Sequence, residues 1–343
     1  MSCGDTRVYL EIEIRRVQCR SCGTVKTETL DWLAKDPFYT KRFAYYVGRR
    51  CRVAPIKDVA RELGLDWHTV KELEKQYMEA QLKKAGNPVA RAIGIDEISI
   101  RKGHTYRIVV SDLERRRPIW FGGEDRSEAS MDTFYAWLGS ERSWQIQVAV
   151  MDMWKPFRTS TLKEEHAPYA AILYDKFHVM RHLGEALDAV RKSEYARLSG
   201  ESRSYIKGQK YTLLSNRENL TLSGRKSLTK LLAANRRLNT AYLLKESFGQ
   251  LWDYKSEAWA RKFFENWKSS LRWQRLPSYE KFARMVERNW GGIAAYCRPE
   301  NKVSLGFVEG LNNKIRVIQR RAYGLRDEEY LRLKILTCML PEL

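Results

Sequence analysis

Apolar residues recur at helical spacing in two short runs between residues 55 and 80, and Gly64 separates the two runs. The first run ends at Leu63, and the second begins at Val70, behind Asp66 as a cap. This spacing predicts two amphipathic helices joined by a turn, which is the pattern of a helix-turn-helix. In that motif the second helix lies in the DNA major groove, and its first residues reach the bases. The residues in that position are Trp67, His68, Thr69, Lys71 and Glu72.

Nearer the start of the chain, apolar and polar residues alternate from Val8 to Ile14, and a CxxC motif follows at Cys19 and Cys22. The alternation predicts a strand, and a strand that leads into a CxxCG turn is typical of one knuckle of a zinc ribbon. A structural zinc takes four ligands and this motif offers two, so two thiols in a plain β-turn are the alternative. We expect residues 1–40 to form a partial zinc-ribbon-like region.

After a polar linker at residues 83–88, the apolar period changes from that of helices to that of strands. The pattern predicts three antiparallel strands, a helix, a strand, a helix and a further strand, followed by helices. The corresponding residues are 92–101, 105–116, 118–125, 127–140, 146–154, 156–168 and 170–179. This order is that of a ribonuclease-H-like fold, an α/β fold with a mixed sheet and flanking helices.

Two aspartates stand within these predicted strands. Asp96 interrupts an apolar strand, and Asp152 ends a later one. A buried carboxylate without a partner costs several kcal/mol, so its position requires a hydrogen bond or a cation. In a ribonuclease-H-like fold these two strands are neighbours, and Mg²⁺ would neutralise the facing carboxylates. Glu97 points to the opposite side of the strand, so it cannot bind the same ions.

A helix predicted over residues 304–324 supplies a third carboxylate, Glu309. Val308, Leu311 and Ile315 form its buried stripe, and polar residues follow one another on the other side. Glu309 would complete the metal site, with an ordinary surface glutamate as the alternative. The polar residues that we expect to bind DNA phosphates are Asn313, Arg316, Arg320 and Arg321.

Residues 186–300 are predicted to form a helical insertion rich in aromatic residues. Trp259, Phe263 and Trp267 recur at four-residue spacing within it. We expect most of these rings to pack between helices, although aromatic residues beside Arg and Lys also suit stacking on nucleic-acid bases.

Asp175 and two histidines follow the last predicted strand. We expect Asp175 to cap the helix that follows it, with an auxiliary role at the metal site as the alternative. His178 and His182 stand four residues apart on that helix, and they would suit zinc only if further ligands joined them.

The composition narrows the partners of the chain. Among 343 residues, 62 are Lys or Arg and 42 are Asp or Glu, which gives a formal net charge of +20 and an isoelectric point near 9.7. This surplus favours nucleic acid as a partner over a basic surface that binds nothing. No apolar stretch approaches the roughly 18 residues of a membrane span, so we expect a cytoplasmic protein associated with the nucleoid. The scattered cysteines do not make a disulfide framework.

The segments "GIDEISIRKGHTY", "DKFHVMRHLGEALDAVR" and "VEGLNNKIRVIQRRAYG", with the CxxCG and the helix-turn-helix, resemble transposases of the ISL3 family of bacterial insertion sequences. The resemblance implies a DDE transposase that binds terminal inverted repeats, cuts DNA strands and joins them to a target. It implies Asp96, Asp152 and Glu309 as the catalytic triad, holding two Mg²⁺ ions for which Mn²⁺ substitutes. It also implies a dimer or larger assembly on DNA. Members of the family usually carry an earlier CxxC pair, so we expect an amino terminus shortened within the zinc ribbon.

These patterns predict a division of the chain into five ranges. The ranges are 1–40 for the ribbon-like region, 41–82 for the helix-turn-helix domain, 90–185 and 301–343 for the two parts of the catalytic domain, and 186–300 for the insertion.

Two other functions remain open. A DNA-binding remnant without catalysis is one alternative, and a ribonuclease-H-like nuclease is the other. The three carboxylates argue against the first, and the helix-turn-helix argues against the second.

Overall fold

The computed structural model describes residues 2–3, 6–36, 38–101, 105–197, 199–304, 306–322 and 325–343. The chain divides into two compact units. Unit 1 comprises residues 1–88, 117–121 and 311–343, and unit 2 comprises residues 89–116 and 122–310. Within the described residues, every helix is too short or too polar to cross a membrane.

Unit 1 contains the predicted helix-turn-helix. Helix α1 (Lys41–Val53) is followed by α2 (Ile56–Leu63) and α3 (Trp67–Ala85). Gly64 ends α2 with φ +62°, a left-handed conformation that glycine adopts without strain. Asp66 caps α3, because its carboxylate accepts a hydrogen bond from the His68 N–H at 2.8 Å. The two helices and the turn between them are therefore confirmed.

Helix α1 was not anticipated as a separate element, and it covers both helices of the motif. Val47 of α1, Val59 of α2 and Val70 of α3 belong to one buried core. A side chain at Gly48 would overlap the ring of Tyr77, so glycine allows α1 to approach α3 closely.

The carboxyl-terminal helix α16 (Glu328–Thr337) belongs to the same unit and packs on α3. Tyr330 and Leu333 share a buried cluster with Tyr77. The buried carboxylate of Glu74 lies 2.6 Å from Lys334 Nζ and accepts a hydrogen bond from the Tyr330 hydroxyl. The sequence predicts that residues 301–343 belong to the catalytic domain, and it gives no sign of these contacts between α16 and α3.

The amino-terminal region of unit 1 consists of two short hairpins. Strand β1 (Ser2–Cys3) pairs with β2 (Thr6–Arg7), and β3 (Arg16–Gln18) pairs with β4 (Val25–Thr27). The strand predicted from Val8 to Ile14 is wrong, because these residues adopt no regular structure and Leu10 is 66% exposed. Alternation supplies an apolar side, but a strand also requires a hydrogen-bonded partner and a core to cover that side.

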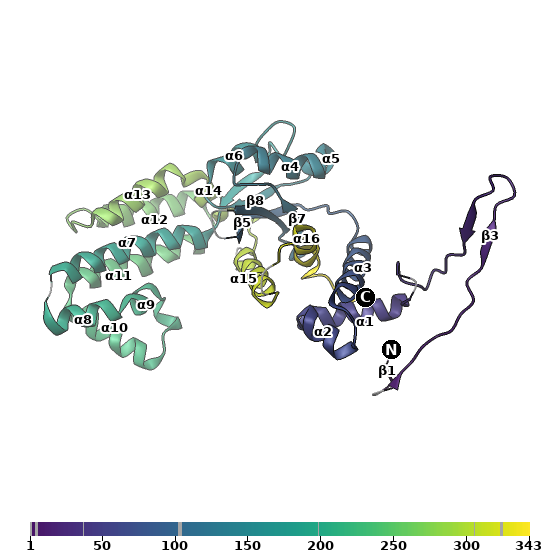
Figure 1. Cartoon of the computed structure of the whole chain (residues 1–343). Coiled ribbons are helices and arrows are strands. Elements are labelled where there is room, and N and C mark those ends of the chain that lie inside the picture. Colours follow the sequence, from purple (N-terminus) through teal and green to yellow (C-terminus); the bar gives the residue numbers. More distant parts are fainter. Residues whose placement is uncertain are drawn as a thin grey trace. The chain divides into compact units, whose positions relative to one another are not determined.

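The predicted order of three strands, a helix, a strand, a helix and a strand is confirmed. The sheet contains β5 (Ala92–Arg101), β6 (Thr105–Asp112), β7 (Arg117–Gly122), β8 (Val148–Met151) and β9 (Ala171–Tyr174), in the spatial order β7-β6-β5-β8-β9. Strand β5 pairs antiparallel with β6 and parallel with β8, and β8 pairs parallel with β9. The sheet is therefore mixed. Helices α4 (Glu128–Leu138) and α6 (Lys155–Thr161) lie over one face, with the short α5 (Ser140–Ser143) beside them (Figure 1).

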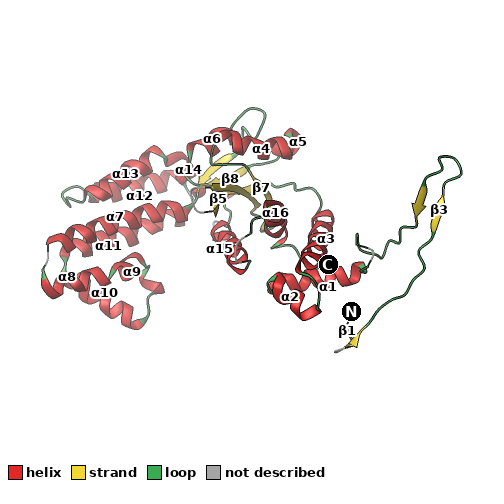
Figure 2. Ribbon diagram, in the orientation of Figure 1, coloured by secondary structure: helices red, strands yellow, loops and turns green. Residues whose placement is uncertain are grey.

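Beyond β9, unit 2 is helical, as Figure 2 shows. Helix α7 (Lys176–Arg197) leads into this region, and α15 (Gly306–Arg321) follows it. Positions 305, 323 and 324 of the helix predicted over 304–324 lie outside the described residues. The elements between are α8 (Gly200–Gly208), α9 (Lys210–Leu214), α10 (Leu222–Ala234), α11 (Arg236–Phe248), α12 (Glu257–Ser270), α13 (Pro277–Arg288), α14 (Trp290–Ala294) and the 3-10 turns Arg217–Asn219, Gly249–Asp253, Ala295–Cys297 and Pro299–Asn301.

Many aromatic residues of this helical region are buried between its helices, as expected, and others are partly buried. The ring of Phe248 lies 4.8 Å from that of Trp267 and 4.9 Å from that of Phe282, measured between ring centroids. Two tryptophans depart from this pattern, because Trp259 is 61% exposed and Trp273 is 86% exposed.

Candidate active site

The register of the sheet predicts that Asp96 and Asp152 occupy corresponding positions along two neighbouring strands. Gly94 of β5 is paired with Val150 of β8 in a parallel ladder. When this register is continued by two residues, Asp96 comes opposite Asp152. Because side chains alternate along a strand, Asp96 shares the face of Gly94 and Asp152 shares the face of Val150. Neighbouring strands are about 4.8 Å apart, so continuing the register would set the two side chains side by side on one face.

The beginning of α15 covers this same face. A Cβ at Gly94 would lie only 2.6 Å from Cγ2 of Val308, so the absence of a side chain at Gly94 allows the helix to approach. Val308 shares a buried cluster with Ala92 of β5 and Val150 of β8. Glu309 follows Val308 directly and is half-buried. The third predicted carboxylate thus belongs to the helix that packs on the face of the two aspartates.

The described residues do not gather the three predicted carboxylates into one metal site. Among the described residues, no group of three or more His, Cys, Asp or Glu side chains could hold a metal ion. One carboxylate oxygen of Asp96 accepts a hydrogen bond from the Glu97 N–H at 2.8 Å, and Asp152 does the same with the Met153 N–H at 2.6 Å. Carboxylate oxygens on adjacent strands are the donors that Mg²⁺ prefers, so this pair fits such a cation.

A third aspartate stands in the same row. Met151 of β8 is paired with Tyr174 of β9, so the next residue, Asp175, lies opposite Asp152. Asp175 is buried, and its carboxylate accepts a hydrogen bond from the Phe177 N–H at 3.0 Å. This is the helix cap expected from the sequence. The row of aspartates nevertheless places Asp175 beside the site.

His178 faces this row from the first turns of α7. Its Nδ1 lies 3.7 Å from Oδ2 of Asp175. Burial by itself would lower the pKa of His178, but Asp175, Asp152 and Asp96 together raise it above its usual value. His182 is separate, because its Nδ1 lies 3.3 Å from a carboxylate oxygen of Glu185. The two histidines therefore have different partners, and the described residues provide no third zinc ligand for them.

Sequence reasoning missed Arg126, which contacts the neighbour of Asp96 and a residue shortly after Asp152. Its Nη2 lies 3.0 Å from Oε1 of Glu97, the neighbour of Asp96. Its guanidinium carbon lies 4.6 Å from the ring centroid of Trp154, two residues after Asp152, and the Trp154 indole N–H donates to the Arg126 carbonyl at 2.7 Å. Burial, followed by Asp96, raises the pKa of Glu97, and Arg126 opposes this shift. Arginine in a loop gives no periodic pattern, so nothing in the sequence indicated it.

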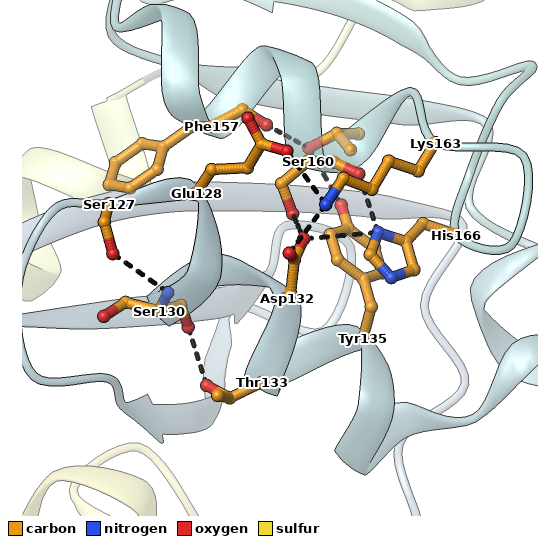
Figure 3. Close-up of polar contacts among 11 residues, drawn as sticks. Ser127, Glu128, Ser130, Asp132, Thr133, Tyr135, Phe157, Ser160, Lys163 and His166 are labelled. Carbon is orange, nitrogen blue, oxygen red and sulfur yellow. Dashed lines mark hydrogen bonds and ion pairs between the residues drawn. The ribbon is translucent and has the colours of Figure 1, made fainter.

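Helix α6, which begins shortly after Asp152, is held on α4 by a polar network (Figure 3). Asp132 of α4 accepts hydrogen bonds from Ser160 Oγ at 2.6 Å and Lys163 Nζ at 2.7 Å. The ring of His166 stacks on Tyr135 at 4.4 Å, and its Nδ1 is 2.7 Å from the Ser160 carbonyl. The backbone that carries Asp152 therefore leads into an anchored helix.

The predicted DNA-facing residues of α3 differ in their surroundings. Trp67 is 42% exposed, its ring centroid is 3.5 Å from that of the exposed His68, and Thr69 is half-buried. Lys71 turns toward α16, where its Nζ lies 2.6 Å from Asp327 Oδ2. The beginning of α3 is thus open to a partner at Trp67 and His68, whereas the charge of Lys71 is paired.

The predicted polar side of α15 is exposed within unit 1. Asn313, Arg316 and Arg320 are exposed, and Arg316 Nη1 donates to Asn313 Oδ1 at 3.1 Å. Arg321 is also exposed, and its Nη1 donates to the Arg52 carbonyl at 2.9 Å. Leu311 and Ile315 are buried as predicted.

The CxxC motif forms the turn between β3 and β4. The Gly23 N–H donates to the Cys19 carbonyl at 2.8 Å, and Gly23 has φ +69°. Hydrogen bonds from the Ser21 hydroxyl and from the backbone N–H groups of Cys22 and Ser21 lower the pKa of Cys19 to about 6. A thiol with a lowered pKa suits metal binding, but the described residues provide no set of three ligands around it.

Comparisons with known proteins agree with these features. A family model of ISL3 transposases, described as "Transposase", matches residues 93–335, and the "Helix-turn-helix domain of transposase family ISL3" matches residues 28–78. The chain is 34% identical over 332 residues to the transposase for insertion sequence element IS1001 of Bordetella parapertussis, covering 96% of this chain and 80% of that relative.

More distant relatives give the same result. The chain is 28% identical over 357 residues to the transposase for insertion sequence element IS1557 of two Mycobacterium tuberculosis strains, covering 96% of this chain and 78% of each relative. The first family model spans all three predicted catalytic carboxylates, and the second spans α2 and most of α3. The chain belongs to the ISL3 family of DDE transposases, enzymes that cleave and transfer DNA strands, and it binds DNA through a helix-turn-helix.

Proposed function

We propose that this transposase cuts DNA at the terminal inverted repeats of an insertion sequence and joins the cut ends to a target, with Asp96, Asp152 and Glu309 as its catalytic carboxylates. The observation that supports this most is the parallel register of β5 and β8, because it pairs two carboxylates on the face that α15 covers. This arrangement favours a ribonuclease-H-like core. Asp175 would be an auxiliary carboxylate in the same row.

The three carboxylates would hold two Mg²⁺ ions, with Mn²⁺ as a substitute. When bound, such ions activate a water or a DNA 3′-hydroxyl and stabilise the leaving oxygen of an in-line displacement. The protein contributes the position of these groups. Arg126 would position Glu97 and Trp154, the neighbours of the two aspartates along the chain, through an ion pair and a cation–π contact. Helix α15 would bring Glu309 to the same face, because Val308 beside it packs on β5 and β8.

DNA recognition is proposed for two exposed surfaces of unit 1. Trp67, His68 and Thr69 at the start of α3 would contact base edges, and Lys71 would support α3 through Asp327 or exchange that partner for a phosphate. Asn313, Arg316, Arg320 and Arg321 of α15 would contact phosphates.

The two ends of the insertion sequence must be held together for transposition, which favours a dimer or larger assembly. Cys19 and Cys22 would supply two ligands of a zinc ion.

The test is metal-dependent cleavage of labelled duplexes that carry the flanking inverted repeats. Wild type is compared with Asp152→Asn, which keeps the shape of the side chain but removes its charge. The matched control is Asp253→Asn, at an exposed aspartate of unit 2. We expect nicking at the repeat ends with Mg²⁺ or Mn²⁺, no nicking by Asp152→Asn, and unchanged duplex binding by all three proteins.

Other outcomes would identify the alternatives. Binding to the repeats without cleavage under any metal condition would indicate a DNA-binding remnant. Cleavage that ignores the repeats and yields no joined products would indicate a nuclease. Normal cleavage by Asp152→Asn, Asp96→Asn or Glu309→Gln would remove that residue from the proposed triad.

A further inference from the structure

The turn between α12 and α13 exposes a tryptophan that the active site does not explain. The two helices form a hairpin within unit 2, and the turn lies at its outer end (Figure 1). Leu271 and Leu276 are buried at the two ends of the turn, whereas Trp273 between them is 86% exposed. A buried leucine on each side anchors the turn to the hairpin, so its conformation is not that of a loose loop. An indole in water at an anchored turn favours a partner that covers it.

The backbone of this turn is strained at two residues. Trp273 has φ +74° and Arg275 has φ +53°, in the left-handed region that residues other than Gly, Asn and Asp rarely adopt. Neighbouring groups hold this conformation. The Arg237 guanidinium donates to the Arg275 carbonyl at 2.6 Å, and it also lies 3.2 Å from a carboxylate oxygen of Glu194. Strain that the surroundings maintain is a feature of binding sites more often than of plain connections.

The charge around the indole is positive. The guanidinium carbon of Arg272 lies 5.5 Å from the ring centroid of Trp273, and Arg275 follows two residues later. In the described part of the chain, neither guanidinium lies within ion-pair distance of a carboxylate. The turn therefore combines an exposed aromatic ring with two arginines whose charges are available to an anion.

We propose that this turn binds DNA at unpaired bases, with Trp273 stacked on a base and Arg272 and Arg275 bound to the adjacent phosphates. Stacking on an aromatic side chain together with phosphate contacts is how proteins bind single strands without reading their sequence. This proposal depends on the proposed function in one respect, namely that DNA is the substrate. It requires neither the carboxylate triad nor a metal ion.

The comparison within the chain is Trp259. It is also exposed, and Lys262 Nζ lies 5.2 Å from its ring, but it stands on the regular helix α12. It therefore has the same chemistry without the strained turn and without the two arginines. Trp259→Ala is the matched control for Trp273→Ala.

The experiment measures binding in EDTA by fluorescence anisotropy, using three labelled DNAs without repeat sequence. These are a single strand of about 12 nucleotides, a duplex with a splayed end, and a fully paired duplex. The proteins are wild type, Trp273→Ala, Trp273→Phe, the double variant Arg272→Gln and Arg275→Gln, and Trp259→Ala. A 2-aminopurine in the single strand reports stacking, since stacking quenches its fluorescence.

We expect Trp273→Ala to bind the single strand and the splayed duplex about tenfold more weakly, in line with the loss of one base stack, and to lose the quenching. Trp273→Phe should restore part of both. The arginine variant should bind more weakly with a smaller salt dependence. Equal single-strand affinities for wild type and Trp273→Ala, or equal losses for Trp259→Ala, would overturn the proposal. Cleavage of repeat duplexes by the same proteins tests the proposed function separately.

Discussion

The helix-turn-helix and the carboxylate site differ in how far apart their parts lie in the sequence. Helices α2 and α3 are separated by a short turn, and Gly64 and Asp66 in that turn end one helix and begin the other. Asp96, Asp152 and Glu309 come from two strands and a distant helix. The difference shows that the DNA-binding motif depends mainly on local signals, whereas the site depends on a sheet register that no single segment contains.

Removing one charge of the Glu74–Lys334 pair tests whether the local motif is sufficient. Lys334→Met leaves the buried carboxylate of Glu74 without its cation, so we expect a loss of about 3–5 kcal/mol in the free energy of unfolding. Urea denaturation measures this loss. The exposed pair of Arg61 and Asp58 is the control, and Arg61→Met should cost at most about 1 kcal/mol. Equal small losses would mean that α2 and α3 do not depend on α16.

A side chain at Gly94 tests the contact that brings α15 to the carboxylates. Gly94→Ala places a Cβ 2.6 Å from Val308, so we expect about 1–3 kcal/mol of destabilisation from overpacking. Adding Val308→Ala should recover part of this loss, which a double-mutant cycle measures. Gly249→Ala is the control, because nothing lies within 4 Å of the added methyl group. Simple additivity of Gly94→Ala and Val308→Ala would contradict the contact.

The cap of α3 tests a local signal by itself. Asp66→Ala removes the acceptor of the His68 N–H, so we expect a loss of about 1 kcal/mol, and Asp66→Asn should retain most of the stability. Thermal unfolding measures both. Glu72→Ala, at an exposed position of the same helix, should change the free energy by less than about 0.5 kcal/mol. A loss at Glu72 equal to that at Asp66 would mean that the cap is not the cause.

The network on α4 should give the smallest effect, at acid pH. Burial raises the pKa of Asp132, but hydrogen bonds from Lys163 and Ser160 outweigh burial and leave it below its usual 3.8. The charged form is therefore favoured in the folded state. Its contribution is complete above pH 3.8 and disappears as the pH falls through the lower folded pKa. Urea denaturation from pH 6 to pH 3 should show a steeper decline for wild type than for Asp132→Asn. Parallel curves would contradict this assignment.

The sequence predicted the positions of helices and strands better than it predicted which residues surround them in the fold. Periodicity located the strands and the helix-turn-helix, and the aspartates stood out as charges in apolar strands. The same periodicity predicted a strand from Val8 to Ile14 that does not form, because period alone does not supply a partner strand. Arg126 and Asp175 beside the site could not be ranked from sequence, since their importance comes from neighbours on other elements.

The sequence by itself determined the positive charge, the period of each element, the glycine and the cap of the DNA-binding motif, and the candidate carboxylates. The tertiary structure decided the parallel register of β5 and β8, the packing of Val308 of α15 on these two strands, and the packing of α16 on α3. It also decided that Trp273 is exposed while Trp267 is buried. The physical reason is that capping and periodicity act within a few residues, whereas register, burial and ion pairing depend on segments that only folding brings together.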